Sequence, residues 1–329
     1  MFAKPWKLPG AKLPLCPSKY ITTKYRSMEN ECKYVSSRGL FKSTDIHNKV
    51  AGSSNGVLDL EEFKKTDRGS ILYVCNSAIR AFVLEVLPFI TDRFVLVSGD
   101  SDNAMPFSVL SQDEFTAFVA DKRLQHWFCQ NLLITHHKMT HLPIGLDYHT
   151  ISKVGEQHPW GIGSLPVDQE KDLEACIEEA VSPALRYPLC YSNFHHAAWG
   201  IGDRGDRKEV VATVPKDLVY YDPHYTARVD GWKRQSQFSF VLSPMGGGYD
   251  CHRTWEALCL GCIPIVKSSG LDPLFEELPV LIVKKWSDVT RELLDSTVRL
   301  FHGKMFHMDK LRLDHWMWLI RQQSLLCKS

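Results

Sequence analysis

The sequence has no long apolar run. Near the middle of its 329 residues, the apolar stretch AFVLEVLPFI (81–90) contains Glu85 and Pro88. It is much shorter than the roughly 20 residues that cross a bilayer as a helix. The N-terminal MFAKPWKLPGAKLPLCP has prolines where a signal peptide needs an unbroken apolar segment. These absences predict no transmembrane segment and no secretory signal, and they favour a cytoplasmic location.

The sequence also has little net charge and no cysteine framework. Its 39 Lys and Arg residues balance 38 Asp and Glu residues, which argues against a nucleic-acid partner because such binding needs a basic face. The one C-x-x-C pair, Cys259 and Cys262, has no second pair at zinc-site spacing, so we expect reduced thiols. The pattern Gly-x-Gly-x-x-Gly occurs once, as GIGDRG (200–205) before the helix-like DRKEVV, and a single match of this kind is too common to assign a Rossmann oxidoreductase.

Strand-like and helix-like segments alternate from residue 70 onward, which is typical of parallel α/β sheets. A capping box, Ser111 with Glu114, begins a helix in SQDEFTAFVADKRLQHWFCQN, and another helix is predicted at 78–90. The expected strands of the first series are 70–76, 93–99, 131–137 and 139–145. Those of the second series are 187–194, 238–244, 262–267 and 279–286.

The two series predict an α/β protein with two Rossmann-like domains that face a central cleft. We place the N-terminal domain at 1–185 and the C-terminal domain at 186–329. The last helix carries a wide apolar stripe that includes Trp316 and Ile320, so we expect it to pack back on the first domain. Ligands of such sheets bind beyond the carboxyl ends of the strands, where candidate residues are therefore sought.

The stretch SPMGGGYDCHRTWEALCLGCIPIV (243–266) has the features of a phosphate site. A predicted strand ends there, and a glycine-rich turn then permits close backbone approach and positive φ angles. A helix-like run follows the turn, and the N-terminus of a helix presents unpaired N–H groups to an anion. The residues predicted to line the turn are Ser243, Gly246, Gly247 and Gly248.

Charged side chains accompany this turn. Asp250 is predicted to be the N-cap of the helix, and His252 and Arg253 in its first turn add donors for an anion. Glu256 shares their helix face and can accept from a ribose diol, and Lys267 is a further cation for the diphosphate. The set predicts a nucleotide-diphosphate site. The alternative is an ordinary glycine-rich turn beside an exposed Arg253–Glu256 pair.

The motif GGGYDCHRTWEALCLGCIPIVKSSGLDPLFEELPVLIV resembles the donor-binding half of exostosin-like glycosyltransferases. It looks still closer to the chlorovirus-type xylosyltransferases and to the ribitol xylosyltransferase of animal glycans. LQHWFCQN (124–131), HLPIGLDYH (141–149) and LCYSNFH (189–195) extend the resemblance over roughly residues 70–295. It implies the GT-B architecture and an inverting, metal-independent enzyme without a cofactor. The enzyme would transfer a sugar, with xylose as the best candidate, from a UDP-sugar to a glycan hydroxyl. A microbial or virus-infected cell would suit such a chain.

The same resemblance assigns roles position by position. It makes Arg253 and His252 contacts of the diphosphate and Glu256 a contact of the ribose, while Ser243 and the three glycines line the donor. NFHHAAWGIGDRGDRKEV (193–210) fits the first loop of the second domain, where Arg204 or Arg207 would reach the β-phosphate. The alternative for either arginine is a solvated loop charge.

Transfer with inversion needs a proton acceptor within reach of the acceptor hydroxyl, and we expect it from the first domain. Asp102 is narrowly preferred over Asp100, because LVSGDSDNAMP places both after the predicted strand 93–99. Asp147 is assigned to the acceptor or to the shape of the cleft. The other candidates are Asp45, His47, His136 and His137, of which His47 is also assigned to the acceptor side.

Two other functions stay open at the level of the sequence. Asp100 and Asp102 form an Asp-x-Asp pair, which is how GT-A transferases hold Mn²⁺ against a nucleotide diphosphate. That fold leaves the 243–267 segment unexplained. A nucleotide- or glycan-binding module without catalysis would keep this segment and tolerate the loss of every acid in the first domain.

Overall fold

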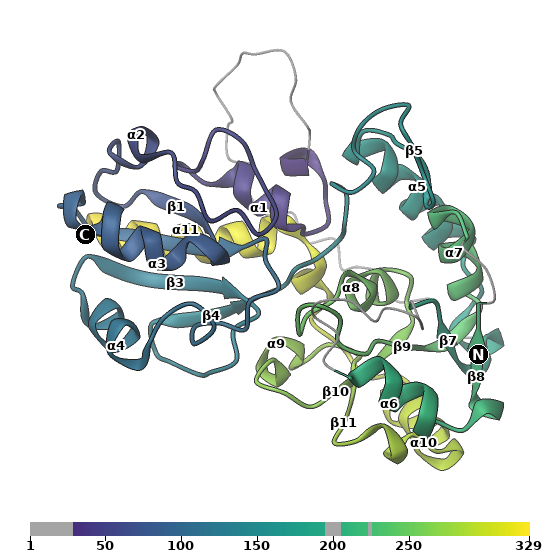
Figure 1. Cartoon of the computed structure of the whole chain (residues 1–329). Helices are drawn as coiled ribbons and strands as arrows, with labels where there is room; N and C mark the ends of the chain where they lie inside the picture. The colour runs from purple at the N-terminus through teal and green to yellow at the C-terminus, as the bar shows by residue number, and fades with distance from the viewer. Residues whose placement is uncertain (1–28, 195–204, 223–225) are drawn as a thin grey trace.

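The structure is a computed structural model that describes residues 29–194, 205–222 and 226–329. Two open parallel sheets organise these residues, each with helices on its faces (Figure 1). The first sheet contains β1 (Ile71–Cys75), β2 (Phe94–Gly99), β3 (Leu124–Gln130) and β4 (Met139–Leu142). The second contains β7 (Tyr187–Ser192), β8 (Val219–Tyr221), β9 (Phe238–Leu242), β10 (Ile263–Lys267) and β11 (Leu281–Val283). The predicted α/β class with two Rossmann-like domains, as in the GT-B architecture, is confirmed.

Helices and a short hairpin connect these strands. The longer helices are α4 (Gln112–Ala120), α5 (Pro166–Glu179), α6 (Asp206–Thr213), α7 (Arg228–Gln235), α8 (His252–Cys259), α10 (Arg291–Phe301) and α11 (Leu313–Lys328). The shorter ones are α1 (Ser37–Ser43), α2 (Leu60–Phe63), α3 (Ile79–Ala81) and α9 (Asp272–Phe275). The hairpin joins β5 (Gln157–His158) to β6 (Gly161–Ile162). No helix in the described ranges is long and apolar enough to span a membrane.

The strand order of the first sheet, β1-β2-β3-β4, follows the chain. Right-handed crossovers between such strands place the connecting helices on one face, so the other face needs cover from elsewhere in the chain. Helix α11 supplies this cover. Its Trp316, Met317 and Ile320 are buried in one cluster with Val95 and Val97 of β2 (Figure 1).

The apolar cluster under α11 continues into the second sheet. It includes Tyr191 of β7, Val241 of β9 and Trp255 of α8. The opposite face of the second sheet has its own cluster, in which Phe240 packs with Trp286. The two sheets therefore share one continuous apolar core.

The predicted boundary at 185 separates the strands of the two sheets. The first sheet ends at Leu142, and the second begins at Tyr187. Helix α5 precedes the boundary in the chain, yet it packs against α7 of the second domain. The division of the chain at this position remains a proposal.

Three predictions about the first sheet need correction. The helix that begins with the capping box ends at Ala120, and the segment 124–130 that follows it is strand β3. The predicted strand 131–137 is not one, and it forms only a bridge from Leu132 to Met105. The predicted helix at 78–90 contains only one turn of α-helix, followed by a π-turn over 82–86 and a 3₁₀ turn at Pro88.

Candidate functional site

The second sheet reverses its strand order between β7 and β9, which are neighbours in the order β11-β10-β9-β7-β8. Ligands of open parallel sheets bind in the crevice at such a reversal, beyond the carboxyl ends of the strands. Helix α6 is the next helix after β7, and the loop 243–251 leads from β9 to α8. The segment singled out by the sequence therefore lies at the crevice that the topology predicts.

Two guanidinium groups lie at the glycine-rich loop. A Cβ atom built on Gly246 would be 2.9 Å from Arg207 Nη2. Arg253 Nη1 donates to Pro244 O at 3.4 Å, and its guanidinium carbon lies 5.6 Å from the centre of the Phe194 ring. Burial lowers the pKa of Arg253, and the nearby charge of Arg207 acts in the same direction.

Neither guanidinium group pairs with a carboxylate of the described residues. Arg207 Nε is buried and has no hydrogen-bond partner there. Two cations held close together and partly desolvated are unfavourable unless an anion joins them. Guanidinium groups suit phosphate oxygens because they donate in a planar fork.

The N-terminus of helix α8 is a further source of positive charge beside the two arginines. Its N-cap residue is Cys251, whose side chain makes no capping hydrogen bond. The first N–H groups of a helix have no intrahelical acceptor and carry a partial positive charge. The prediction that Asp250 is the N-cap was wrong, because the Asp250 carboxylate is engaged elsewhere.

The Asp250 carboxylate joins the two domains. Its Oδ2 accepts from Ile144 N of the first domain at 2.7 Å, and its Oδ1 accepts from Trp255 Nε1 and Cys251 N, each at 2.9 Å. Asp250 N donates to Asn131 Oδ1, also at 2.9 Å. Burial raises the pKa of Asp250 to about 6 in spite of these donors. Asp250 thus fixes the start of α8 against the first domain.

The three glycines let neighbouring side chains approach the loop backbone closely. None of them has a positive φ, which the sequence had also suggested as their role. A Cβ atom on Gly247 would lie 2.1 Å from Asp102 Oδ2. One on Gly248 would lie 3.1 Å from both Asp102 Oδ1 and Asn131 Nδ2. The exposed Asp102 carboxylate of the first domain therefore lies directly against the loop of the second.

The remaining donor-side predictions have different surroundings. Ser243 is buried, with its Oγ 2.8 Å from Thr254 Oγ1. His252 reaches the first domain, where its Nδ1 donates to Gly145 O at 2.7 Å. Glu256 is half-buried, and its carboxylate forms no hydrogen bond or close ion pair with a described residue, although its charge acts on Arg253. Arg204 lies outside the described residues.

The positive charge of Lys267 is balanced by two carboxylates. Its Nζ lies 3.0 Å from Asp206 Oδ1 and 2.6 Å from Glu209 Oε2, and these contacts raise its pKa. Asp206 Oδ2 accepts from Met245 N of the loop at 2.8 Å. Lys267 therefore supports the loop through Asp206, whereas the sequence presented it as a free cation.

Asp100 and Asp102 have different partners. Asp100 has a φ of 60° and is buried, with its Oδ2 3.1 Å from Arg38 Nη2 and its Oδ1 accepting from Ser53 Oγ at 3.1 Å. Asp102 instead lies against Gly247. No group of three His, Cys, Asp or Glu residues in the described ranges is placed to hold a metal ion. That the enzyme works without a metal ion stays a prediction.

Asp147 and His149 follow β4 and lie beside His252. The Asp147 carboxylate accepts from Thr150 N at 2.9 Å and lies 3.1 Å from His149 Nδ1 and 3.7 Å from Arg228 Nη2. Burial alone would raise the pKa of Asp147, but His252, His149 and Arg228 hold it below its ordinary value. Asp147 thus lies at the domain interface, and its role in binding the acceptor or shaping the cleft stays a prediction.

The other acid and histidine candidates lie farther from the loop. Asp45 Oδ2 accepts from Ile71 N, which places Asp45 at the amino end of β1. His136 and His137 precede β4, also at the amino edge of the first sheet. His47 packs on Phe41, with 4.2 Å between the ring centres, and its Nδ1 donates to Asn48 O.

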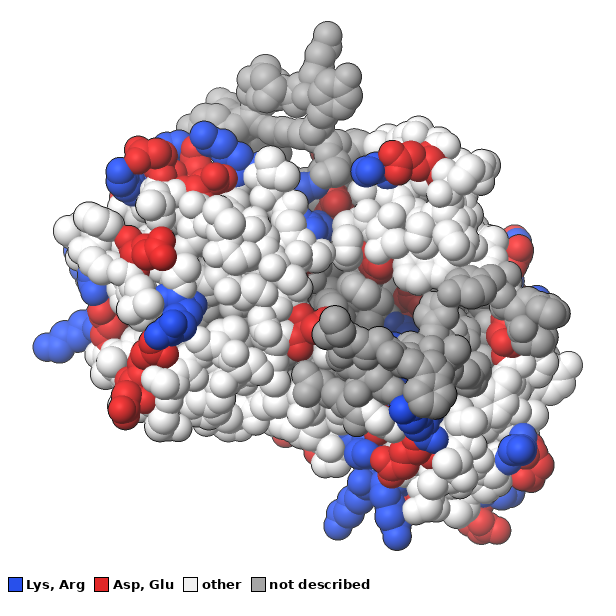
Figure 2. Space-filling view, viewed as in Figure 1, with Lys and Arg blue, Asp and Glu red and all other residues white. Residues whose placement is uncertain are grey.

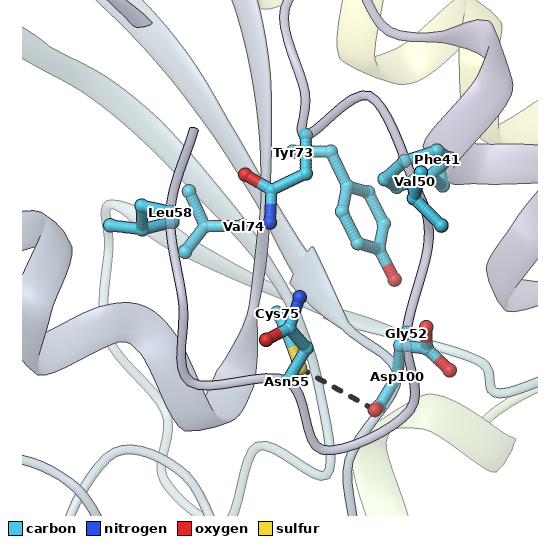
Figure 3. A pocket seen from close by; sticks show the side chains of 10 residues that line it. Phe41, Val50, Gly52, Asn55, Leu58, Tyr73, Val74, Cys75 and Asp100 are labelled. Carbon is cyan, nitrogen blue, oxygen red and sulfur yellow. Dashed lines mark hydrogen bonds between the residues drawn. The ribbon is translucent and has the colours of Figure 1, made fainter. Parts of the chain in front are cut away.

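A small pocket lies at the carboxyl ends of β1 and β2, next to Asp100 (Figure 3). Tyr73, Cys75, Asn55 and Val50 are among the residues that line it. The Tyr73 hydroxyl is buried without a hydrogen-bond partner in the described part of the chain, and Cys75 Sγ donates to Asp100 O at 3.5 Å. The pocket therefore presents polar groups, Asp100 among them, at the carboxyl edge of the first sheet.

The described residues on the face shown in Figure 2 form no extended patch of one charge. Lys and Arg side chains lie next to Asp and Glu side chains around its rim. This pattern agrees with the balanced composition of 39 basic and 38 acidic residues. Local charge, as at Arg207 and Arg253, therefore matters more for ligand binding than the overall field.

Sequence reasoning missed four residues at this interface. Asn131 and Asp206 hold the loop 243–251 from the two domains, and Arg38 holds Asp100. His149 contacts Asp147. His149 lies inside the HLPIGLDYH segment, two residues after Asp147, so its position was a usable signal. Nothing in the sequence marks Arg38.

Comparisons with known proteins add no argument to the geometry described above. No protein-family model matches the chain, and no curated protein matches it, so the resemblance to exostosin-like and xylosyltransferase groups has no support from them. One solved structure with some likeness is WaaG, described as a glycosyltransferase involved in lipopolysaccharide biosynthesis. It shares 10% identity at a TM-score of 0.23, over 79% of this chain and 95% of that chain. At this TM-score the likeness has no bearing on function.

Proposed function

We propose that the chain is a glycosyltransferase that holds the diphosphate of a nucleotide sugar at the 243–251 loop. The observation that carries this proposal is the pair Arg207 and Arg253. Both guanidinium groups lie at a glycine-rich loop, at the strand-order reversal of the second sheet, without a carboxylate partner among the described residues. A diphosphate supplies the missing negative charge.

Leaving-group stabilisation is the chemical task of this cation pair. When the bond between the sugar and the diphosphate breaks, negative charge grows on the phosphate oxygens. Fixed donors directed at that charge lower the barrier, because they need no reorganisation. Arg207, Arg253 and the first N–H groups of α8 are such donors, so a metal ion is not required in this proposal.

The acceptor side is assigned to the first domain. We propose that the acceptor hydroxyl enters the cleft between β2 and α8, where Asp100, Asp102 and Asp147 supply polar groups. In an inverting transfer one group of this side removes the proton of the hydroxyl. Asp102 and Asp100 remain the carboxylates predicted for that role. Glu256, whose carboxylate forms no hydrogen bond with a described residue, is proposed as the contact of the ribose.

The donor is proposed to be a UDP-sugar, with xylose as the first sugar to try. Only the sequence motif supports the choice of uridine and xylose. The glycan that accepts the sugar is not specified by any side chain described above.

Thermal unfolding against a panel of nucleotides tests the proposal. UDP, GDP, CMP and ADP are each added with Mn²⁺ or with EDTA. A ligand at a hundred times its dissociation constant stabilises the folded state by about 2.7 kcal/mol, which shifts Tm by a few degrees. We expect UDP to raise Tm in EDTA. No shift with any nucleotide would contradict the proposal, and a shift only with Mn²⁺ would favour the Asp-x-Asp alternative.

A further inference from the structure

His149 is half-buried at the interface between the domains. Its side chain is 28% exposed, and it lies in the first domain opposite the first turn of α8, with 6.0 Å between its ring and that of His252. The charged groups that act on it are Asp147, His252, Arg38 and Asp100. It is therefore a titratable group at the domain interface that the assignments above leave without a role.

The orientation of His149 is set through Asp147. The Asp147 carboxylate accepts from Thr150 N and Oγ1 at 2.9 and 2.7 Å, while Arg228 donates from Nη1 to the backbone O of Asp147 and has its Nη2 3.7 Å from the carboxylate. The imidazole Nδ1 lies 3.1 Å from this carboxylate, at ion-pair distance but without the geometry of a hydrogen bond. The nearby negative charge favours the tautomer with the proton on Nδ1, which leaves the lone pair on Nε2.

The environment also keeps the imidazole neutral at pH 7. Burial lowers the pKa of His149, and His252 and Arg38 act in the same direction. Asp147 and Asp100 oppose them. A base must be unprotonated before the reaction and must be stabilised once it has taken the proton, and an Asp beside a neutral His meets both needs.

The two aspartates predicted for the same task are less well placed. Both carboxylate oxygens of Asp100 are engaged, by Arg38 and Ser53. Asp102 lies against Gly247 of the loop where the diphosphate is proposed to bind, so its negative charge is next to the leaving group. His149 has neither disadvantage.

We propose that His149 is the proton acceptor of the transfer and that Asp147 is its positioning residue. This inference rests on the proposed function. In the step, the acceptor oxygen forms a bond to the anomeric carbon while the bond from that carbon to the diphosphate breaks. The electron pair of the broken bond stays on the diphosphate, and the hydroxyl proton moves to Nε2 of His149.

The test compares His149→Gln with Asp102→Asn and with a control, His137→Gln, at the opposite edge of the first sheet. The probe is UDP release from UDP-xylose with water as the acceptor, together with the dissociation constant of UDP in EDTA. Loss of a general base lowers turnover about 10²- to 10⁴-fold. We expect that loss for His149→Gln with the UDP dissociation constant unchanged, and no loss for His137→Gln. A His149→Gln rate within threefold of wild type would overturn the inference.

The pH profile and the tautomer separate this inference from the proposed function. Turnover should fall as pH drops through the pKa of His149. Asp147→Asn should move that limb to lower pH, because Asp147 is a charge that raises this pKa. NMR of ¹⁵N-labelled imidazoles reports the tautomer without turnover. A proton on Nε2 would overturn the role of His149 even in an active enzyme. An Nδ1-protonated His149 in a chain that releases no UDP from any UDP-sugar contradicts the proposed function, and the catalytic role with it.

Discussion

At the scale of single residues, the partners of each charged side chain decide what it can bind. Lys267 is neutralised by Asp206 and Glu209, whereas Arg207 and Arg253 have no such carboxylate among the described residues. Arg38 shows a third situation, a buried pair with Asp100. Such a pair matters most for stability when one partner is removed, because a buried charge is then left uncompensated.

Replacing Arg38 by Met should destabilise the fold. The Arg38 and Asp100 side chains are 10% and 7% exposed, and breaking a buried pair costs about 3–5 kcal/mol. Arg80→Met is the matched control, because Arg80 pairs with Glu114 on the surface at 61% exposure, where a pair contributes about 0–1 kcal/mol. Urea unfolding at pH 7 measures both. Equal losses in the two variants would mean that the Arg38–Asp100 pair is not buried as described.

At the scale of elements, the loop 243–251 and α8 are held by contacts from the other domain. Asp250 accepts from Ile144 N, His252 donates to Gly145 O, and Asp102 lies against Gly247. The glycine-rich loop is thus shaped on both sides of the cleft. Its geometry depends on the domain interface as much as on its own sequence.

The buried Asp250 should give stability a pH dependence of defined sign. Its pKa is about 6 in the folded chain against 3.8 for a solvated aspartate, so ionisation disfavours the folded state. The contribution of Asp250 is largest below pH 4 and falls as pH rises from 4 to 6. We therefore expect the stability of wild type relative to Asp250→Asn to decrease over that range in urea unfolding. A difference that is constant or rises with pH would refute the assignment.

At the scale of the whole molecule, the last helix packs on the first sheet. The order β1-β2-β3-β4 leaves one face without crossover helices, and α11 covers it from the far end of the chain. The same apolar cluster continues to Trp255 of the second domain. The two domains are therefore joined by a core as well as by the Asp250 contacts.

Two tryptophans of α11 test this arrangement. Trp316 is 4% exposed and Trp318 is 52% exposed. Trp316→Ala should destabilise the chain by about 3–5 kcal/mol, the usual cost of removing a buried tryptophan. Trp318→Ala should change stability by about 0.5 kcal/mol or less, as surface substitutions do. The reverse order in thermal unfolding would show that α11 packs through its other face.

The fold was predictable from the sequence because its strands are continuous apolar runs between amphipathic helices. Two strands of the parallel sheets were missed: β3, whose LQHWFCQ contains Gln and His and follows a helix without a glycine or proline between them, and β8, which is only three residues long. The local motif correctly placed His252 and Arg253 in the first turn of one helix, while their contacts to a diphosphate stay a prediction. Where distant segments meet, nothing in the sequence signals the contact, because Asn131 and Arg38 reach the site through tertiary contacts alone.

Calorimetric titration with UDP in EDTA tests whether Arg207 and Arg253 bind a diphosphate, on which the proposed function depends. A charge-assisted hydrogen bond contributes about 1.5–3 kcal/mol, or roughly a tenfold to hundredfold change in affinity. We expect Arg207→Ala and Arg253→Ala each to weaken UDP binding by at least tenfold. Arg299→Ala, which removes an exposed charge of α10, should bind as wild type does. Unchanged UDP binding in both arginine variants would contradict the assignment of this site.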